Sequence, residues 1–142
     1  MGKGTVDVSI TIRAPIARVF ERLSDHEGMA KWPGIAGSRL VKDGEPTRNG
    51  LGAIRRVKVS GLTLDEEVVH FDAPTAYDYT IIKGMPVDHR GKVRLAESSG
   101  AVQVTWSVRL ASRVPLVAQL MALGLRRGLP KALAYLKAEL ER

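Results

Sequence analysis

The stretch "AIRRVKVSGLTLDEEVVHF", residues 53–71, decides the fold. Apolar and polar side chains alternate on both sides of Ser60-Gly61, which predicts two strands joined by a tight turn. A two-residue turn there places Arg55 opposite Glu66 and gathers the apolar side chains of both strands on one face. A slip of one residue would turn those apolar side chains outward, so the favoured register also puts a charged pair on the inner face.

Further alternating segments lie on either side of this hairpin, separated by Gly, Pro and Ser about every ten residues, which is typical of consecutive antiparallel strands. The expected strands are residues 5–13, 38–42, 51–59, 62–71, 76–83, 87–97 and 101–111. Helical spacing of apolar residues predicts a helix at 14–25, a second short helix at 26–34 and a long one at 115–142.

The order of these elements predicts an α+β fold that forms one domain over residues 1–142. The curved sheet of seven antiparallel strands, with two short helices between strands 1 and 2, needs a cover for its apolar face. The long C-terminal helix is the only large candidate. Gly124, Gly128 and Pro130 interrupt that helix, which favours a bend and a cavity between helix and sheet.

Alternation across the other turns extends the inner face over the whole sheet. Gly91 is expected to leave room for the rings of Tyr79 and Trp106. The expected transverse rows are Arg55–Glu66–Ile81–His89–Val108 and Ala53–Val68–Tyr79–Gly91–Trp106, with His70 beside Tyr77. The residues expected to line a ligand site are Trp32, Val57, Val68, His70, Tyr77, Tyr79, Ile81, Gly91, Val104, Trp106, Val108, Leu120 and Leu123.

Arg55, Glu66 and His89 are the candidate catalytic residues, because they are the titratable groups of the first row. A buried ion pair brings little net stability, so the pair either closes the sheet and fixes its register or acts on a ligand. A buried carboxylate or imidazole can be tuned for proton transfer near neutral pH. Both interpretations stay open at this point.

The composition narrows the classes of function. The chain has 142 residues, no cysteine and a net charge of +7, with basic residues scattered along the sequence. Aromatic residues make up 5%, too few for a base-stacking surface, so a nucleic acid partner is not expected. The three histidines lack the spacing of metal ligands and no phosphate-binding glycine loop is present, so we expect neither a metal nor a cofactor.

The sequence contains no apolar run of about 18 residues and no pattern of a signal peptide, so we expect a cytoplasmic protein without a membrane span. Its positive charge would allow transient contact with an anionic membrane. The expected oligomeric state is a monomer or a homodimer.

Several short motifs, in this order, resemble the SRPBCC superfamily, which includes the START lipid-transfer domains, the birch-pollen allergens and the polyketide cyclase/dehydrase group. They are "VDVSITIRAPIARVFERLSD", "HEGMAKWPG", "GLTLDEEVVHFDAPTAYDYTI", "KGMPVDHRGKVRL", "VQVTWSVRL" and the final amphipathic helix. The chain resembles most the polyketide cyclase/dehydrase branch. In that branch a "G-x-x-R" pattern, here Gly52 to Arg55, opens a strand, and a Glu lies on the next one.

This resemblance implies a helix-grip fold with a deep cavity for an apolar or aromatic small molecule. It points to Arg55, Glu66, Tyr79 and His89 as polar pocket groups. The favoured function is a carrier or sensor of a hydrophobic ligand such as a lipid, polyketide, quinone or isoprenoid. The alternatives are a polyketide cyclase/dehydratase-like enzyme and a protein-interaction domain like the chaperone activators of the same superfamily.

Overall fold

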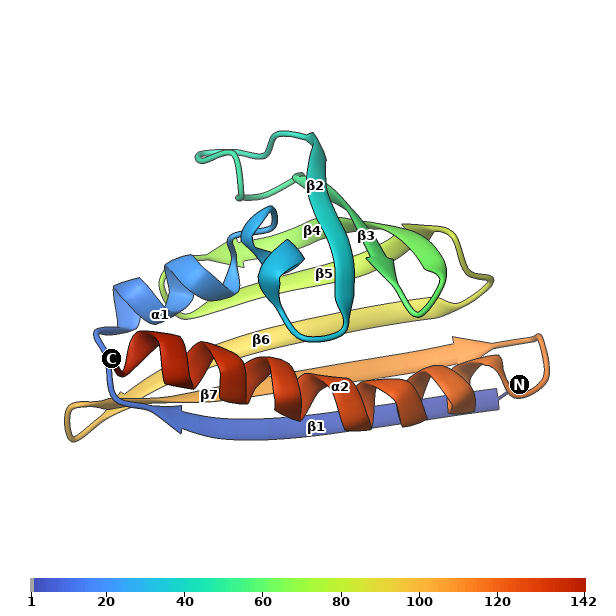
Figure 1. Ribbon diagram of the computed structural model, residues 1–142. Helices are drawn as coiled ribbons and strands as arrows, with labels where there is room; N and C mark the ends of the chain where they lie inside the picture. Colours follow the sequence, from blue (N-terminus) through green and yellow to red (C-terminus); the bar gives the residue numbers. More distant parts are fainter. Residues whose placement is uncertain (1) are drawn as a thin grey trace.

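Seven antiparallel strands form one curved sheet, and a long helix lies across it (Figure 1). The computed structural model describes residues 2–142. Its elements are β1 (Gly2–Ile12), α1 (Ile16–Leu23), the 3-10 helix η1 (Gly28–Lys31), β2 (Ile35–Lys42), β3 (Ile54–Val59), β4 (Leu62–Asp72), β5 (Ala76–Lys83), β6 (Asp88–Ser98), β7 (Ala101–Ser112) and α2 (Val117–Leu140). The strand order is β1-β7-β6-β5-β4-β3-β2. The predicted α+β helix-grip fold is confirmed.

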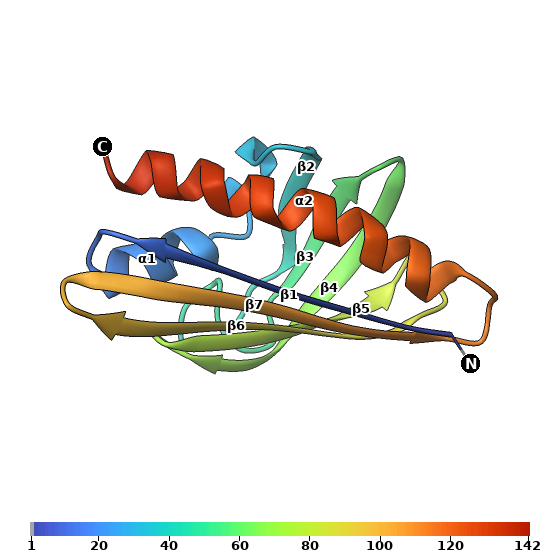
Figure 2. The same ribbon diagram turned by 90° about the horizontal axis from the view of Figure 1, so that it is seen from below.

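Helix α2 lies on one side of the sheet and packs mainly on β1 and β7 (Figure 2). Its C-terminal half buries the large side chains of Leu129, Leu133 and Leu136. Its N-terminal half buries only Ala118 and Ala122. Since large apolar side chains give most of the burial energy, the C-terminal half holds the helix to the sheet.

The N-terminal half of α2 comes very close to β1 at Gly4. A Cβ atom on Gly4 would lie 2.7 Å from the carbonyl oxygen of Ala118 and 2.8 Å from the Cβ of Ala122. Because these small residues occupy the contact, two leucines of this half point away from the sheet, and Leu120 is 64% and Leu123 43% exposed. The prediction that Leu120 and Leu123 line the interior is therefore wrong.

The register of the central hairpin agrees with the prediction from its alternation and turn. Arg55 lies opposite Glu66, and Ser60 and Gly61 form the turn with positive φ angles of 51° and 77°. The register also agrees across the next strands, in the pairs Glu66–Ile81, Val68–Tyr79 and Tyr79–Gly91.

A β-bulge in β4 changes the face of its last residues. The pairing with β5 shifts between Val68 and His70, so that one extra residue reverses the alternation. His70 is consequently exposed, and Phe71 packs against Phe20 with ring centroids 5.5 Å apart. The prediction that His70 points inward beside Tyr77 is therefore wrong.

The turn between β6 and β7 also differs from the prediction. It is formed by Ser99 and Gly100, with φ angles of 51° and 77°, instead of Ser98 and Ser99. The shift by one residue in the turn moves the pairing by two, so the same residues of β7 stay on the inner face. The pairs expected as His89–Val108 and Gly91–Trp106 are observed as His89–Leu110, Gly91–Val108 and Val93–Trp106.

Candidate functional site

Arg55 lies at the centre of a group of polar side chains inside the protein, with 1% of its surface exposed. Its Nε donates to Glu66 Oε1 over 2.9 Å, and its Nη1 donates to His26 Nδ1 over 3.1 Å and to Tyr77 Oη over 3.4 Å. The guanidinium carbon also lies 4.4 Å from the centroid of the Tyr79 ring. These five residues are called the buried polar cluster below.

The electrostatics of the cluster keep Arg55 charged. Burial works toward a lower pKa of Arg55, but the Glu66 carboxylate and the two neighbouring tyrosines raise this pKa above its ordinary value. Burial raises the pKa of Tyr77 and of Tyr79, so both hydroxyls keep their hydrogens at neutral pH. The cluster therefore holds one ion pair among neutral hydrogen-bonding groups.

His26 belongs to this cluster, although no pattern of the sequence places it there. It follows α1 in a connecting segment, where no alternation or helical spacing indicates a face. Its Nε2 donates to the backbone oxygen of Asn49 over 3.0 Å, so Nδ1 is free to accept from Arg55. Burial and the Arg55 charge lower the pKa of His26 to about 3, so the imidazole is neutral.

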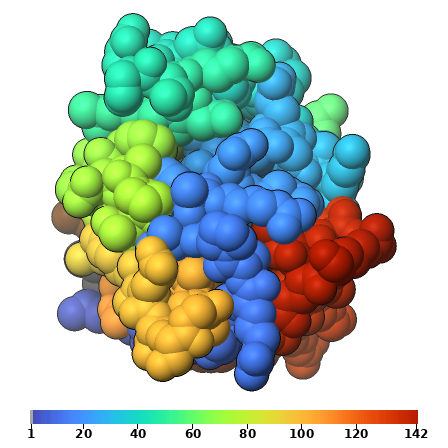
Figure 3. Space-filling view, turned by 90° about the vertical axis from the view of Figure 1, so that its left-hand side faces the viewer, coloured from blue at the N-terminus to red at the C-terminus, as the bar shows by residue number. Residues whose placement is uncertain are grey.

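One side of the cluster is sealed and has its hydrogen bonds satisfied. Tyr77 donates from Oη to the backbone oxygen of Leu23 over 3.0 Å, which ties the cluster to the end of α1. Figure 3 looks onto this end, where α1, the segment after β2 and the C-terminal end of α2 pack together. This side has the features of a structural core.

The other side retains hydrogen-bonding groups that no described residue uses. Tyr79 Oη accepts from Trp106 Nε1 over 2.9 Å, but within residues 2–142 no acceptor takes the hydroxyl hydrogen of Tyr79. His89 Nδ1 accepts from the backbone N–H of Ile81 over 3.2 Å, so Nε2 carries the hydrogen, and no acceptor in that range binds it. Glu66 uses Oε1 for Arg55, and no donor of residues 2–142 reaches its Oε2.

These three groups lie near one another. The ring centroids of Tyr79 and His89 are 5.2 Å apart, and Glu66 lies close enough to influence the pKa of each. Burial lowers the pKa of His89, so this imidazole is neutral at pH 7. Two donors and one carboxylate oxygen thus remain available to a ligand on this side.

Apolar and aromatic side chains complete the inner face. Trp106 packs edge-on against Trp32, which follows η1, with ring centroids 6.0 Å apart. Gly91 lies directly beside the Tyr79 ring, so no larger residue fits there. The other predicted lining residues that are buried here are Val57, Val68, Ile81, Val104 and Val108.

The inner space differs along α2. Packed side chains, including Leu133 and Leu136, fill the space under its C-terminal half, so the cavity expected between helix and sheet does not extend there. Under its N-terminal half Gly124 and Gly128 are exposed, and a Cβ atom on either would meet no atom within 4 Å. Met121 and Leu125 beside them are half-buried. Gly124 and Gly128 therefore face solvent, and Met121 and Leu125 are the side chains of this half that turn toward the sheet.

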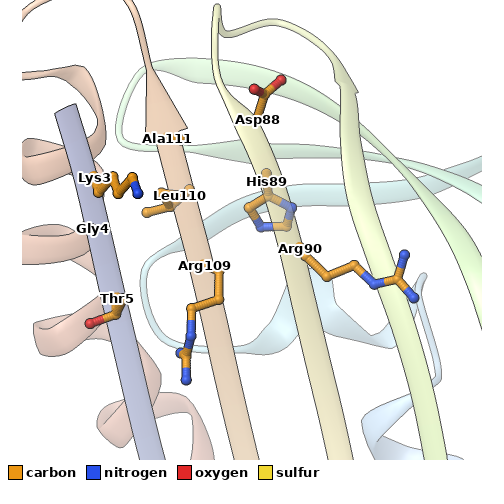
Figure 4. A pocket seen from close by; sticks show the side chains of 9 residues that line it. All are labelled: Lys3, Gly4, Thr5, Asp88, His89, Arg90, Arg109, Leu110 and Ala111. Atoms are coloured by element: carbon orange, nitrogen blue, oxygen red, sulfur yellow. The ribbon is translucent and has the colours of Figure 1, made fainter. Parts of the chain in front are cut away.

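The surface formed by residues 2–142 has two distinct hollows. One, of about 370 Å³, lies on β1, β7 and β6, where Lys3, Arg90 and Arg109 surround it (Figure 4). The other, of about 300 Å³, lies between the start of α1 and the β6–β7 turn. His89 borders the first hollow, but its ring packs against Tyr79 of the buried polar cluster.

Comparison with known proteins gives one family match. The model of the family described as "Polyketide cyclase / dehydrase and lipid transport" matches residues 3–141. Among curated proteins no relative matches the sequence. Within the described residues no helix is long and apolar enough to cross a membrane.

Solved structures resemble the chain over nearly its full length. The Zhui aromatase/cyclase from Streptomyces sp. R1128 is 20% identical with a TM-score of 0.82, covering 99% of this chain and 95% of its own. A START superfamily protein from Mycobacterium smegmatis is 14% identical with a TM-score of 0.80, covering 99% and 98%. The major latex-like protein 151 of Panax ginseng is 16% identical with a TM-score of 0.76, covering 99% of both chains. At these identities the likeness is one of fold.

Proposed function

Because the chain belongs to the polyketide cyclase/dehydrase and lipid-transport family, we propose that it binds a hydrophobic or aromatic small molecule with one polar end, as a carrier or sensor. The ligand lies on the inner face of the sheet beneath the N-terminal half of α2. The observation that carries this proposal is the set of unused groups on Tyr79, His89 and Glu66.

The unused donors define the polar end of the ligand. The Tyr79 hydroxyl and His89 Nε2 both offer hydrogens, which match a carbonyl or ether oxygen. Glu66 Oε2 accepts a hydrogen bond from a hydroxyl on the same molecule. Each such bond adds about 1 kcal/mol.

The apolar body of the ligand lies beside α2. The buried side chains of Val57 and Ile81 line the sheet there, and the half-buried Met121 and Leu125 face it from the helix. A few placed polar groups in a mostly apolar site are typical of small-molecule binding sites. Entry requires α2 and the strands facing it to separate at the N-terminal half of the helix, where burial is smallest.

Native mass spectrometry of the purified protein tests this proposal. We expect a bound small molecule that organic extraction releases and that contains a carbonyl or hydroxyl group. Tyr79→Phe should weaken rebinding of the extracted molecule about tenfold, because one hydrogen bond is lost. Tyr135→Phe, on the half-buried face of α2, is the matched control and should bind as the wild type does. A protein that neither retains nor takes up such molecules would contradict the proposal.

A second function, a cyclase- or dehydratase-like enzyme, is favoured by the free oxygen of Glu66 beside two donors. Glu66 Oε2 would remove a proton from the carbon next to a substrate carbonyl, while Tyr79 and His89 hold the carbonyl oxygen. Glu66→Gln should then abolish turnover of a polyketone substrate and leave binding within about threefold. Equal loss of binding and turnover would instead assign Glu66 to positioning.

A further inference from the structure

Four apolar side chains are exposed together around the start of α2. Val114 and Leu116 lie before the helix and are 43% and 62% exposed, and Leu120 and Leu123 lie in its first two turns and are 64% and 43% exposed. Leu120 and Leu123 are three residues apart and share one face of the helix, and Leu116 directly precedes its first residue. These four residues are called the leucine stripe below.

The backbone at Leu116 is strained. Its φ angle is 69°, in the left-handed region that non-glycine residues rarely adopt. A leucine in this conformation gains no compensating burial, because its side chain is among the most exposed apolar groups of the protein. Strain at an exposed apolar residue indicates a role outside the folded core.

The segment of sequence that carries the leucine stripe has charged residues of one sign. Residues 98–138 contain no aspartate or glutamate, and their basic residues are Arg109, Arg113, Arg126, Arg127, Lys131 and Lys137. Arg127 and Lys131 lie four and eight residues after Leu123 and continue the same face of the helix. Neither forms an ion pair with the residues that the structure describes. Both cations are therefore available to an anionic partner.

From this arrangement we propose that the N-terminal half of α2 docks on the surface of an anionic lipid bilayer. The leucine stripe enters the boundary between headgroups and acyl chains, and Arg113, Arg127 and Lys131 contact lipid phosphates. The apolar residues match the acyl boundary of such a bilayer, and the flanking cations on the same helical face match its anionic headgroups. Figure 1 shows this half of α2 along the outside of the molecule, where a flat surface can reach it.

Charge argues against a second copy of the chain as the occupant. The net charge is +7, and a symmetric pair of leucine stripes would bring the cations of both copies, Arg113, Arg127 and Lys131, into one interface. Repulsion between these cations opposes the pairing, whereas an anionic bilayer attracts them. Docking depends on the helix surface alone and does not require the ligand site proposed above.

Co-flotation with lipid vesicles tests the docking. Vesicles of phosphatidylcholine alone are compared with vesicles that contain about 30 mol% phosphatidylglycerol, at about 0.1 M salt. We expect binding to the anionic vesicles that falls as salt rises. Leu120→Ser should weaken it about tenfold, and Arg127→Gln with Lys131→Gln about 25-fold, since each neutralised cation costs about fivefold.

Two surface variants elsewhere serve as matched controls. Leu51→Ser removes another exposed leucine, which is 51% exposed before β3, and Lys92→Gln removes an exposed cation of β6. Both should bind anionic vesicles within about twofold of the wild type. Circular dichroism checks that all variants remain folded, since every changed side chain lies on the surface.

Three results would overturn the proposal. Equal binding to neutral and anionic vesicles, or none to either, would exclude recognition of an anionic bilayer. Equal losses in the control variants would show that the leucine stripe is not the contact. A dimer in sedimentation velocity that dissociates in Leu120→Ser would assign the stripe to a second copy of the chain.

Discussion

The two halves of α2 have opposite relations to the sheet. The C-terminal half buries leucines over the sealed side of the buried polar cluster, where each hydrogen bond is satisfied. The N-terminal half buries two alanines, exposes leucines and glycines, and faces the side where Tyr79, His89 and Glu66 have unused groups. Stability is thus concentrated at one end of the fold, and the groups available for function lie toward the other.

The largest effect is expected at the centre of the buried polar cluster, from Arg55→Ala. The change leaves the Glu66 carboxylate buried without its partner, so the free energy of unfolding should fall by about 3–5 kcal/mol. Urea unfolding measures this loss. Arg56→Ala breaks the neighbouring ion pair with Asp65 on the outer face, where the Arg56 side chain is 32% exposed, and should cost about 1 kcal/mol or less. Equal losses of unfolding free energy in the two variants would show that the inner and the outer ion pair contribute equally to stability.

The halves of α2 themselves can be compared by one pair of substitutions. Leu133→Ala creates a cavity in the core, because Leu133 is fully buried, and should lower the free energy of unfolding by about 3 kcal/mol. Leu120→Ala, on the exposed face of the other half, should change it by about 0.5 kcal/mol or less. Similar losses in chemical denaturation would show that both halves hold the helix equally.

Acid should weaken the sealed side first through His26. The pKa of this imidazole is about 3 in the folded protein and about 6.5 in the unfolded chain, so below pH 6.5 the unfolded state binds more protons. Stability is therefore present above pH 6.5 and lost as the pH falls, by about 2 kcal/mol between pH 6.5 and 5. Burial also lowers the pKa of His89, so this residue contributes a further loss of stability as the pH falls.

Urea unfolding at several pH values measures this slope. In His26→Gln the imidazole is absent, so the variant should be less stable at pH 7 but should lose less stability on acidification. A variant with the slope of the wild type would contradict the assignment of a neutral buried His26.

The smallest effect is expected at the glycines of the N-terminal half. Gly124→Ala should raise the free energy of unfolding by about 0.5–1 kcal/mol, because the added methyl group meets no atom within 4 Å. Gly4→Ala, at the close contact with Ala118, should lower stability instead. Thermal unfolding of both variants compares an open position on α2 with the tight contact between β1 and α2. A loss of stability in Gly124→Ala would show that position 124 is not open.

Local patterns predicted most of the fold and the centre of the site. The alternation around Ser60-Gly61 and the two-residue turn gave the Arg55–Glu66 register correctly, because these two constraints agree. A bulge adds one residue without any change in hydrophobicity that marks it, so the outward turn of His70 could not be predicted.

The other errors arose where tertiary contacts decide. His26 joins the cluster through a connecting segment, which has no periodicity to indicate its direction. The leucines of α2 have regular spacing, but the close approach of Gly4 to Ala118 and Ala122 selects the alanine face for contact. Sequence spacing identifies the helix, and packing selects which face of it is buried.

The most direct test of the central claim is a titration of the 15N-labelled protein with an aromatic ketone of three fused rings, followed by NMR. We expect shifts at Met121 and Leu125, at the Trp106 indole and around His89, and weaker binding in Tyr79→Phe. Shifts confined to the surface hollow around Lys3, Arg90 and Arg109, or no shifts at all, would contradict ligand binding beneath the N-terminal half of α2.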